Sequence, residues 1–145
     1  MATEEQIKKR YLQFQMLQQQ IQQLSEHLEL LSQQNAELEL SIEAVQELAE
    51  AKLNTELLAP IANGIFVKGG LRDTSRLLVN VGADIAVEKT VPQVVDLLEQ
   101  QKKDIMERMS EADLILQQMT AQAAKVYKEL EKEVEEKKES KNNSS

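Results

Sequence analysis

Cysteine is absent from this chain of 145 residues, and helix-breaking residues are scarce. Without a thiol the chain can form no disulfide, no thiolate metal site and no cysteine nucleophile. The prolines and glycines all lie in one central stretch, as Pro60, Gly64, Gly69, Gly70, Gly82 and Pro92. The long flanks on either side contain no helix breaker, so the sequence predicts a helix, a compact insert and a second helix.

Aromatic residues, positive charge and long apolar runs are also in short supply. Two tyrosines, two phenylalanines and no tryptophan offer little for a thick globular core, which favours an elongated shape. A net charge of -8 works against a nucleic-acid surface, because such surfaces place Lys and Arg against phosphates. No segment approaches the ~20 apolar residues of a membrane span, and the N-terminus has no apolar signal core. We therefore expect a soluble, cytoplasmic protein that binds neither nucleic acid nor membrane.

Both flanks carry the heptad repeat of a coiled coil. In the first flank one core position is held by Ile7, Phe14, Ile21, Leu28, Asn35, Ile42 and Ala49, and the other by Arg10, Leu17, Leu24, Leu31, Leu38, Val45 and Lys52. In the second flank the two positions are held by Val95, Lys102, Met109, Leu116, Ala123 and Leu130, and by Leu98, Ile105, Ala112, Met119 and Val126. Two such seams joined by a compact insert can fold into an antiparallel helical hairpin about 70 Å long, at ~1.5 Å per residue.

Capping chemistry places the boundaries of the predicted elements. Thr3 with Gln6, and Thr90 with Gln93, form the Thr-x-x-Gln pattern of a capping box. Asn54 tolerates the left-handed conformation that is common just past a helix end. We expect the first helix over residues 3–54, the insert over 55–89 and the second helix over 90–138. The polar residues 139–145 are expected to form a disordered tail.

The insert alternates apolar and polar residues with turn signals at short intervals, which predicts two β-hairpins. Asn63-Gly64 separates the strands Leu57–Ile61 and Ile65–Gly69, and Gly82-Ala83 separates Leu77–Val81 from Asp84–Lys89. The fold class is therefore α+β, mainly α.

So small a sheet has unpaired edges and cannot bury both of its faces alone, which favours assembly with other subunits through the insert. The residues expected at this oligomerisation surface are Leu58, Ile61, Phe66, Leu78, Val79, Val81 and Ile85. The alternative is that the hairpins close into a small monomeric cap over the end of the coiled coil.

Long helix, two hairpins and long helix together resemble a prefoldin subunit. The segments Leu57–Gly69 and Leu78–Lys89 are similar to the β region of the alpha class, which carries two hairpins where the beta class carries one. The resemblance implies a heterohexamer of two alpha-type and four beta-type subunits joined through β-barrels. It also implies an ATP-independent holdase that captures unfolded polypeptides between its coiled-coil tips and delivers them to a group II chaperonin.

In an antiparallel hairpin both chain ends meet at the far tip, and three of the four aromatic residues lie in the segments expected there. Leu12 and Met16 fall at outward heptad positions, and adaptable Met and aromatic surfaces suit clients of no fixed shape. The candidate client-binding residues are Ile7, Tyr11, Leu12, Phe14, Met16, Val126, Tyr127, Leu130 and Val134. The alternative for Ile7, Phe14, Val126 and Leu130 is an ordinary role in the coiled-coil seam. The alternative for the other candidates is incidental exposure, since Leu30, Leu40 and Leu114 also lie off the seam in the middle of the arm.

Other candidate sites are weak. His27 is the only histidine and has no second imidazole or thiolate with which to share a metal, so no metal and no cofactor is expected. No residues form an acid–base or nucleophile set, so we expect no enzyme activity. The competing hypothesis is a structural scaffold or filament subunit that polymerises through the insert, because closed and open assemblies use the same interface chemistry.

Overall fold

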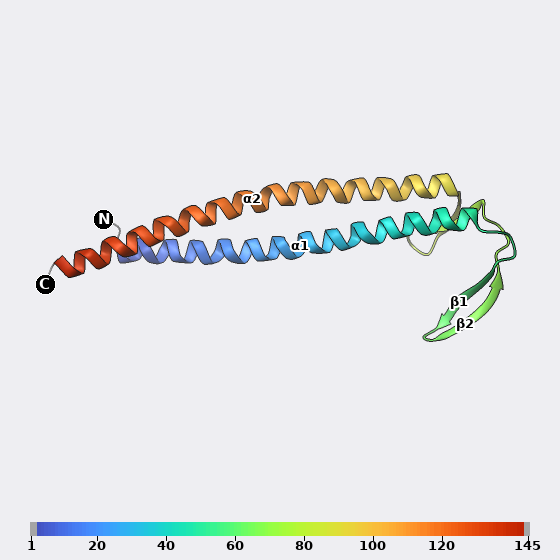
Figure 1. Ribbon diagram of the computed structural model, residues 1–145, viewed down its shortest axis with the longest axis horizontal. Helices are drawn as coiled ribbons and strands as arrows, with labels where there is room; N and C mark the ends of the chain where they lie inside the picture. The colour runs from blue at the N-terminus through green and yellow to red at the C-terminus, as the bar shows by residue number, and fades with distance from the viewer. Residues whose placement is uncertain (1–2, 144–145) are drawn as a thin grey trace. The chain divides into compact units, whose positions relative to one another are not determined.

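The computed structural model describes residues 3–143 and contains two long helices with four short strands between them in the sequence (Figure 1). Helix α1 spans Glu4–Glu50 and helix α2 spans Val91–Asn143. Between them lie β1 (Glu56–Ala62), β2 (Ile65–Gly70), β3 (Arg76–Asn80) and β4 (Ala86–Thr90). The mainly α fold with a central insert of two antiparallel β-hairpins is therefore confirmed.

The chain forms two compact units. The terminal unit comprises residues up to 33 and from 107 onward, and the insert unit comprises residues 34–106. In the terminal unit α1 and α2 run antiparallel, since Arg10 pairs with Glu129 and Glu133, and Glu4 pairs with Lys137. In the insert unit Lys102 Nζ lies 2.8 Å from Glu39 Oε1. The later part of α1 is thus paired with the earlier part of α2, as expected for antiparallel helices.

The predicted heptad residues that lie within the two helices are the covered ones. Lys52, which was also predicted at a seam position, is exposed because it lies beyond the end of α1. Every seam position from Ile7 to Ala49 and from Val95 to Leu130 is buried or half-buried, whereas almost all other helical residues are exposed. In the terminal unit Leu17, Ala123 and Val126 form the buried cluster, with Phe14 and Ile21 packed against it. The periodicity thus assigned the packed face of each helix correctly.

Both predicted capping boxes are present. The backbone N–H of Thr3 donates to Gln6 Oε1 at 3.1 Å and that of Gln6 donates to Thr3 Oγ1 at 3.3 Å, and Thr90 and Gln93 repeat the exchange at 3.0 and 3.3 Å. These bonds satisfy backbone donors that have no partner within the helix, and they fix the start of α1 and α2.

The predicted end of the first helix was wrong by four residues, because α1 ends at Glu50. Asn54 does have a positive φ of 67°, but it lies in the connection and not at the helix end. Its N–H donates to the carbonyl of Leu71 at 2.7 Å, and the N–H of Leu71 donates to the carbonyl of Thr55 at 3.0 Å. This pairing draws the chain away from the helical path and buries Leu71.

The expectation of a disordered tail also differs from the structure, in which α2 continues to Asn143. Residues 139–143 are helical, and Ser144 and Ser145 lie outside the described residues. Glu and Lys are good helix formers, and Lys141 in the last turn complements the negative end of the helix dipole. Polarity alone therefore did not end this helix.

The first hairpin follows the prediction and the second departs from it. β1 pairs with β2 across Asn63-Gly64, with Leu58 opposite Lys68 and an irregular register between Pro60 and Ala62. β3 pairs with β4, but the strands end at Asn80 and restart at Ala86, so the two-residue turn at Gly82-Ala83 is wrong. The connection is longer because three consecutive residues from Gly82 to Asp84 have positive φ.

The two hairpins form two separate two-stranded sheets. The outer edge of every strand has no neighbouring strand anywhere in residues 3–143. A sheet closed into a barrel therefore requires strands from outside this chain.

Candidate functional site

The first candidate surface lies on the parts of the terminal unit nearest the chain ends, where Tyr11, Leu12, Met16, Tyr127 and Val134 are exposed outside the seam. Leu30, Leu114 and Ile115 of the same unit are also exposed but lie farther along the helices. Leu12 is 57% and Met16 is 60% exposed. Tyr11, Tyr127 and Val134 are also exposed, each at the flank of the seam. The structure separates these from the other candidate client-binding residues: Ile7, Phe14 and Leu130 are half-buried, and Val126 is buried in the cluster around Leu17.

An aromatic pair links the helices beside this surface. The rings of Phe14 and Tyr127 lie 5.5 Å apart between centroids at an interplanar angle of 40°, a tilted arrangement favoured by the ring quadrupoles. A hydrogen bond with the Glu131 carboxylate raises the pKa of Tyr127. The pair orders one exposed and one half-buried ring without removing Tyr127 from solvent.

A groove of about 670 Å³ opens next to the aromatic pair. It is lined by Phe14, Gln18, Ile21, Gln22, Thr120, Ala123, Ala124 and Tyr127. On α2 the small side chains of Thr120, Ala123 and Ala124 lie here within two turns, which leaves the hollow. The heptad analysis placed Ala123 in the seam but did not predict that its small neighbours would open the flank.

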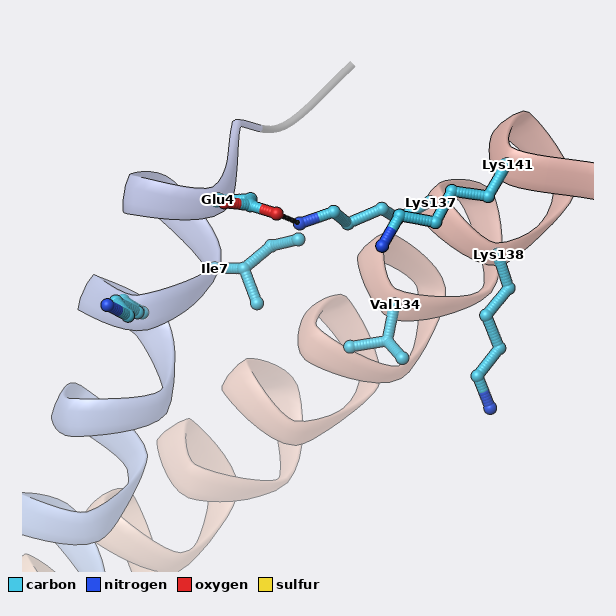
Figure 2. Close-up of a pocket in the computed structure, with 7 residues that line it drawn as sticks. Glu4, Ile7, Val134, Lys137, Lys138 and Lys141 are labelled. Atoms are coloured by element: carbon cyan, nitrogen blue, oxygen red, sulfur yellow. Dashed lines mark ion pairs between the residues drawn. The ribbon is translucent and has the colours of Figure 1, made fainter. Parts of the chain in front are cut away.

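A second hollow, a cleft of about 430 Å³, lies where the two helices end (Figure 2). Its lining residues are Glu4, Ile7, Lys8, Val134, Lys137, Lys138 and Lys141. In Figure 2 the side chains of Ile7 and Val134 face the space between the helices, and Lys137 reaches across it to Glu4. The hydrogen bond and positive charge of Lys137 lower the pKa of Glu4.

Ion pairs hold the helices together on the inner side of this cleft. Arg10 pairs with Glu129, and its Nε lies 3.0 Å from Glu133 Oε1. The Glu133 side chain is only 14% exposed, so its charge needs this partner. This explains why a heptad core position holds an arginine.

The second candidate surface lies on the two hairpins of the insert unit. Phe66 is 55% and Leu78 is 74% exposed. Of the other predicted oligomerisation residues, Leu58, Ile61, Val81 and Ile85 are exposed and Val79 is half-buried. Pro60 stands opposite Phe66, so Leu58, Pro60 and Phe66 share one face of the first hairpin. Apolar side chains and unpaired strand edges thus occur on the same elements.

No group of three or more His, Cys, Asp or Glu residues within residues 3–143 is arranged to hold a metal ion. No helix in the described part of the chain is long and apolar enough to cross a membrane.

Two paired long helices, joined in sequence by two hairpins with unpaired strand edges, define a coiled-coil protein. The family model for prefoldin subunits matches residues 17–137, and the chain belongs to the prefoldin family. It is 29% identical over 133 residues to the prefoldin subunit alpha of Methanococcus aeolicus, with 92% of this chain and 88% of that protein covered. It is 31% identical over 114 residues to the prefoldin subunit alpha of Pyrococcus horikoshii, covering 78% of this chain and 77% of that protein.

A solved structure has the same fold. It is a chain of filamentous PFD from Methanocaldococcus jannaschii, determined by cryo-electron microscopy. The TM-score is 0.69 at 17% sequence identity, and the match covers 79% of this chain and 95% of that chain.

Membership of the family defines the protein as a chaperone-type subunit. Prefoldins are non-enzymatic chaperones, and their alpha subunits form oligomeric complexes with other prefoldin subunits. The expected absence of enzyme activity agrees with this family. The roles of the individual residues on the two candidate surfaces remain predictions.

Proposed function

We propose that this chain is the alpha-type subunit of an ATP-independent holdase that captures unfolded polypeptides and delivers them to a group II chaperonin in the cytoplasm. The complex would contain two alpha-type and four beta-type subunits. The observation that carries the proposal is the exposure of apolar side chains outside the seam of the terminal unit, above all Leu12 and Met16.

These side chains are poorly explained by folding of the chain itself. A residue at an outward heptad position contributes little to a two-helix seam. Any partner that covers it removes apolar surface from water, which is favourable. Burying one such side chain in a client is worth on the order of 1.5 kcal/mol or more. Several subunits that hold one client together multiply this modest gain through effective concentration.

Assembly through the insert supports the same proposal. Exposed apolar residues on both hairpins, together with unpaired strand edges, favour strand addition from neighbouring subunits. An oligomer joined in this way would present several terminal units to one client.

Replacement of Leu12 and Met16 by serine tests client binding directly. Both side chains are exposed, so the double variant should keep its helicity and its assembly while it suppresses aggregation of a denatured client less well. The matched control replaces Leu30 and Leu40 by serine, because these residues are similarly exposed on α1 but lie away from the candidate surface. Protection should be largely retained in the control and should not depend on ATP in any variant.

Two results would contradict the proposal. One is full protection by the Leu12→Ser, Met16→Ser variant at normal assembly. The other is protection that appears only when nucleotide is added.

The alternative is a scaffold or filament subunit. The M. jannaschii protein of the same fold is described as filamentous, and this favours keeping the alternative in the test. Mass measurement after mixing with candidate beta-type subunits separates the two. Once assembly is complete, a closed complex keeps one mass as the concentration rises further, whereas an open polymer continues to grow.

A further inference from the structure

Near the end of α2, lysine and glutamate side chains lie on different faces of the helix. Val134, Lys137, Lys138 and Lys141 follow the i, i+3, i+4, i+7 spacing of one helix face, and all four line the cleft of Figure 2. Glu131 and Glu135 line a different hollow, together with Leu130 and Val134. The acidic residues of this Glu- and Lys-rich segment therefore lie largely outside the cleft.

The cleft itself combines an apolar floor with a positive rim. Ile7 and Val134 supply the apolar surface. Four lysines and a single glutamate line it, in a chain whose net charge is -8. Glu4 is engaged by Lys137, whereas Lys8 and Lys138 form no ion pair within 4 Å among the described residues. At least two ammonium groups are thus available to a ligand.

This combination fits a particular class of occupant. An apolar side chain between carboxylates would bury its apolar part against Ile7 and Val134 and place its charges near the lysines. Lysine suits this role because its flexible stem lets the charge follow ligands of differing geometry. A purely apolar segment would offer no carboxylate to Lys8 and Lys138, and a basic segment would be repelled.

We propose that the cleft between the ends of α1 and α2 binds acidic–apolar segments of unfolded polypeptides, so that the subunit selects clients by charge as well as by apolar content. The proposal rests on the holdase function proposed above and deepens it by naming the class of segment held. Leu12 and Met16 supply apolar contact without charge preference, and the cleft supplies the preference.

The test measures binding of short fluorescent peptides to the full-length chain, alone and in its assembled complex, by fluorescence anisotropy. Three peptides share one length: apolar residues flanked by Asp and Glu, the same apolar residues flanked by Ser, and the acidic flanks with the apolar residues replaced by Ser. The first should bind most tightly, and added salt should weaken its binding more than that of the second. An oligonucleotide of the same net charge should bind weakly.

The decisive variant is Lys8→Gln with Lys138→Gln, which removes two charges from the cleft without breaking an ion pair of the structure. The matched control, Lys125→Gln with Lys128→Gln, removes two exposed charges from α2 outside the cleft. The cleft variant should bind the acidic–apolar peptide roughly two- to thirtyfold more weakly, the range expected for two exposed ion pairs. The control variant should bind it normally, and circular dichroism should show equal helicity in both.

Equal binding of the acidic and serine-flanked peptides, unchanged by the cleft variant, would overturn the charge preference while leaving the holdase function intact. Equal binding of the acidic peptide that lacks apolar residues, or of the oligonucleotide, would reduce the cleft to a general anion site and also overturn the proposal. Failure of the holdase function would give a different result. In that case the Leu12→Ser, Met16→Ser variant would bind the serine-flanked peptide no more weakly than the unchanged chain does.

Discussion

Replacing Phe66 and Leu78 by aspartate should prevent assembly without unfolding the helices. These residues lie on β2 and β3, one on each hairpin, and are 55% and 74% exposed in the single chain. Complete burial of a Phe or Leu side chain is worth about 1.5–3 kcal/mol. Scaled by the exposed fractions, covering both in an interface stabilises the assembly by about 2–4 kcal/mol for each copy of this chain.

The aspartates add a second penalty. A carboxylate buried without a partner costs several kcal/mol after relaxation, so the two effects together exceed the loss of apolar burial alone. Loss of 2–4 kcal/mol by itself weakens association roughly 20- to 1000-fold, at about 1.4 kcal/mol for each factor of ten. Free subunits should therefore predominate at concentrations where the unchanged protein is fully assembled.

The assay is sedimentation velocity of the chain mixed with candidate beta-type subunits, with circular dichroism as the measure of helicity. The matched control is Asn63→Asp with Asn80→Asp, which adds the same two charges to the same hairpins and removes no apolar side chain. An Asp at position 80 keeps an oxygen for the N–H of Gly82, which Asn80 Oδ1 accepts at 2.9 Å. An unchanged mass for Phe66→Asp with Leu78→Asp would show that the interface lies elsewhere.

Two further substitutions test the local structure. Gly64→Ala should destabilise the first hairpin by about 1–2 kcal/mol, because φ is +76° and a Cβ there meets no atom within 4 Å, so backbone strain alone acts. Hydrogen exchange of the β1 and β2 amides should accelerate in this variant. In the control Gly69→Ala it should stay unchanged, because Gly69 has no positive φ. Equal exchange rates in both variants would contradict the need for a positive φ at Gly64. Lys102→Leu should raise Tm by roughly 2–4 °C, because apolar burial at a seam position outweighs a partly exposed ion pair to Glu39. The control Glu39→Gln should change Tm little, and a fall in Tm for Lys102→Leu would show that the ion pair dominates.

The helices and the first hairpin could be predicted because their signals are local. Heptad spacing identified the covered face of α1 from Ile7 to Ala49, and the Thr-x-x-Gln pairs identified both helix starts. Asn63-Gly64 identified the first turn because both residues tolerate a positive φ, although in the structure only Gly64 of the two adopts one. Each of these features depends on residues a few positions apart.

The errors arose where distant residues decide the outcome. The end of α1 depends on the hydrogen bonds that join Asn54 and Thr55 to Leu71, which no local pattern reveals. The longer turn of the second hairpin is a local exception, because it follows from positive φ at three consecutive residues from Gly82 to Asp84 and from the hydrogen bond that Asn80 Oδ1 accepts from the N–H of Gly82. The cleft lined by lysines required the lateral arrangement of two helix ends, although the spacing of Val134, Lys137, Lys138 and Lys141 could have indicated their common face.

The two exposed apolar surfaces differ in a way that suits them to different partners. On the hairpins, apolar side chains accompany unpaired backbone donors and acceptors, so a partner must supply a strand in a defined register. On the helices of the terminal unit the backbone is already satisfied, and only side chains such as Leu12 and Met16 offer contacts. A helix surface therefore imposes no register on its partner and accepts many sequences. A strand edge, in contrast, requires a partner strand in one register. On this argument the hairpins would hold permanent subunits and the terminal unit would hold transient clients.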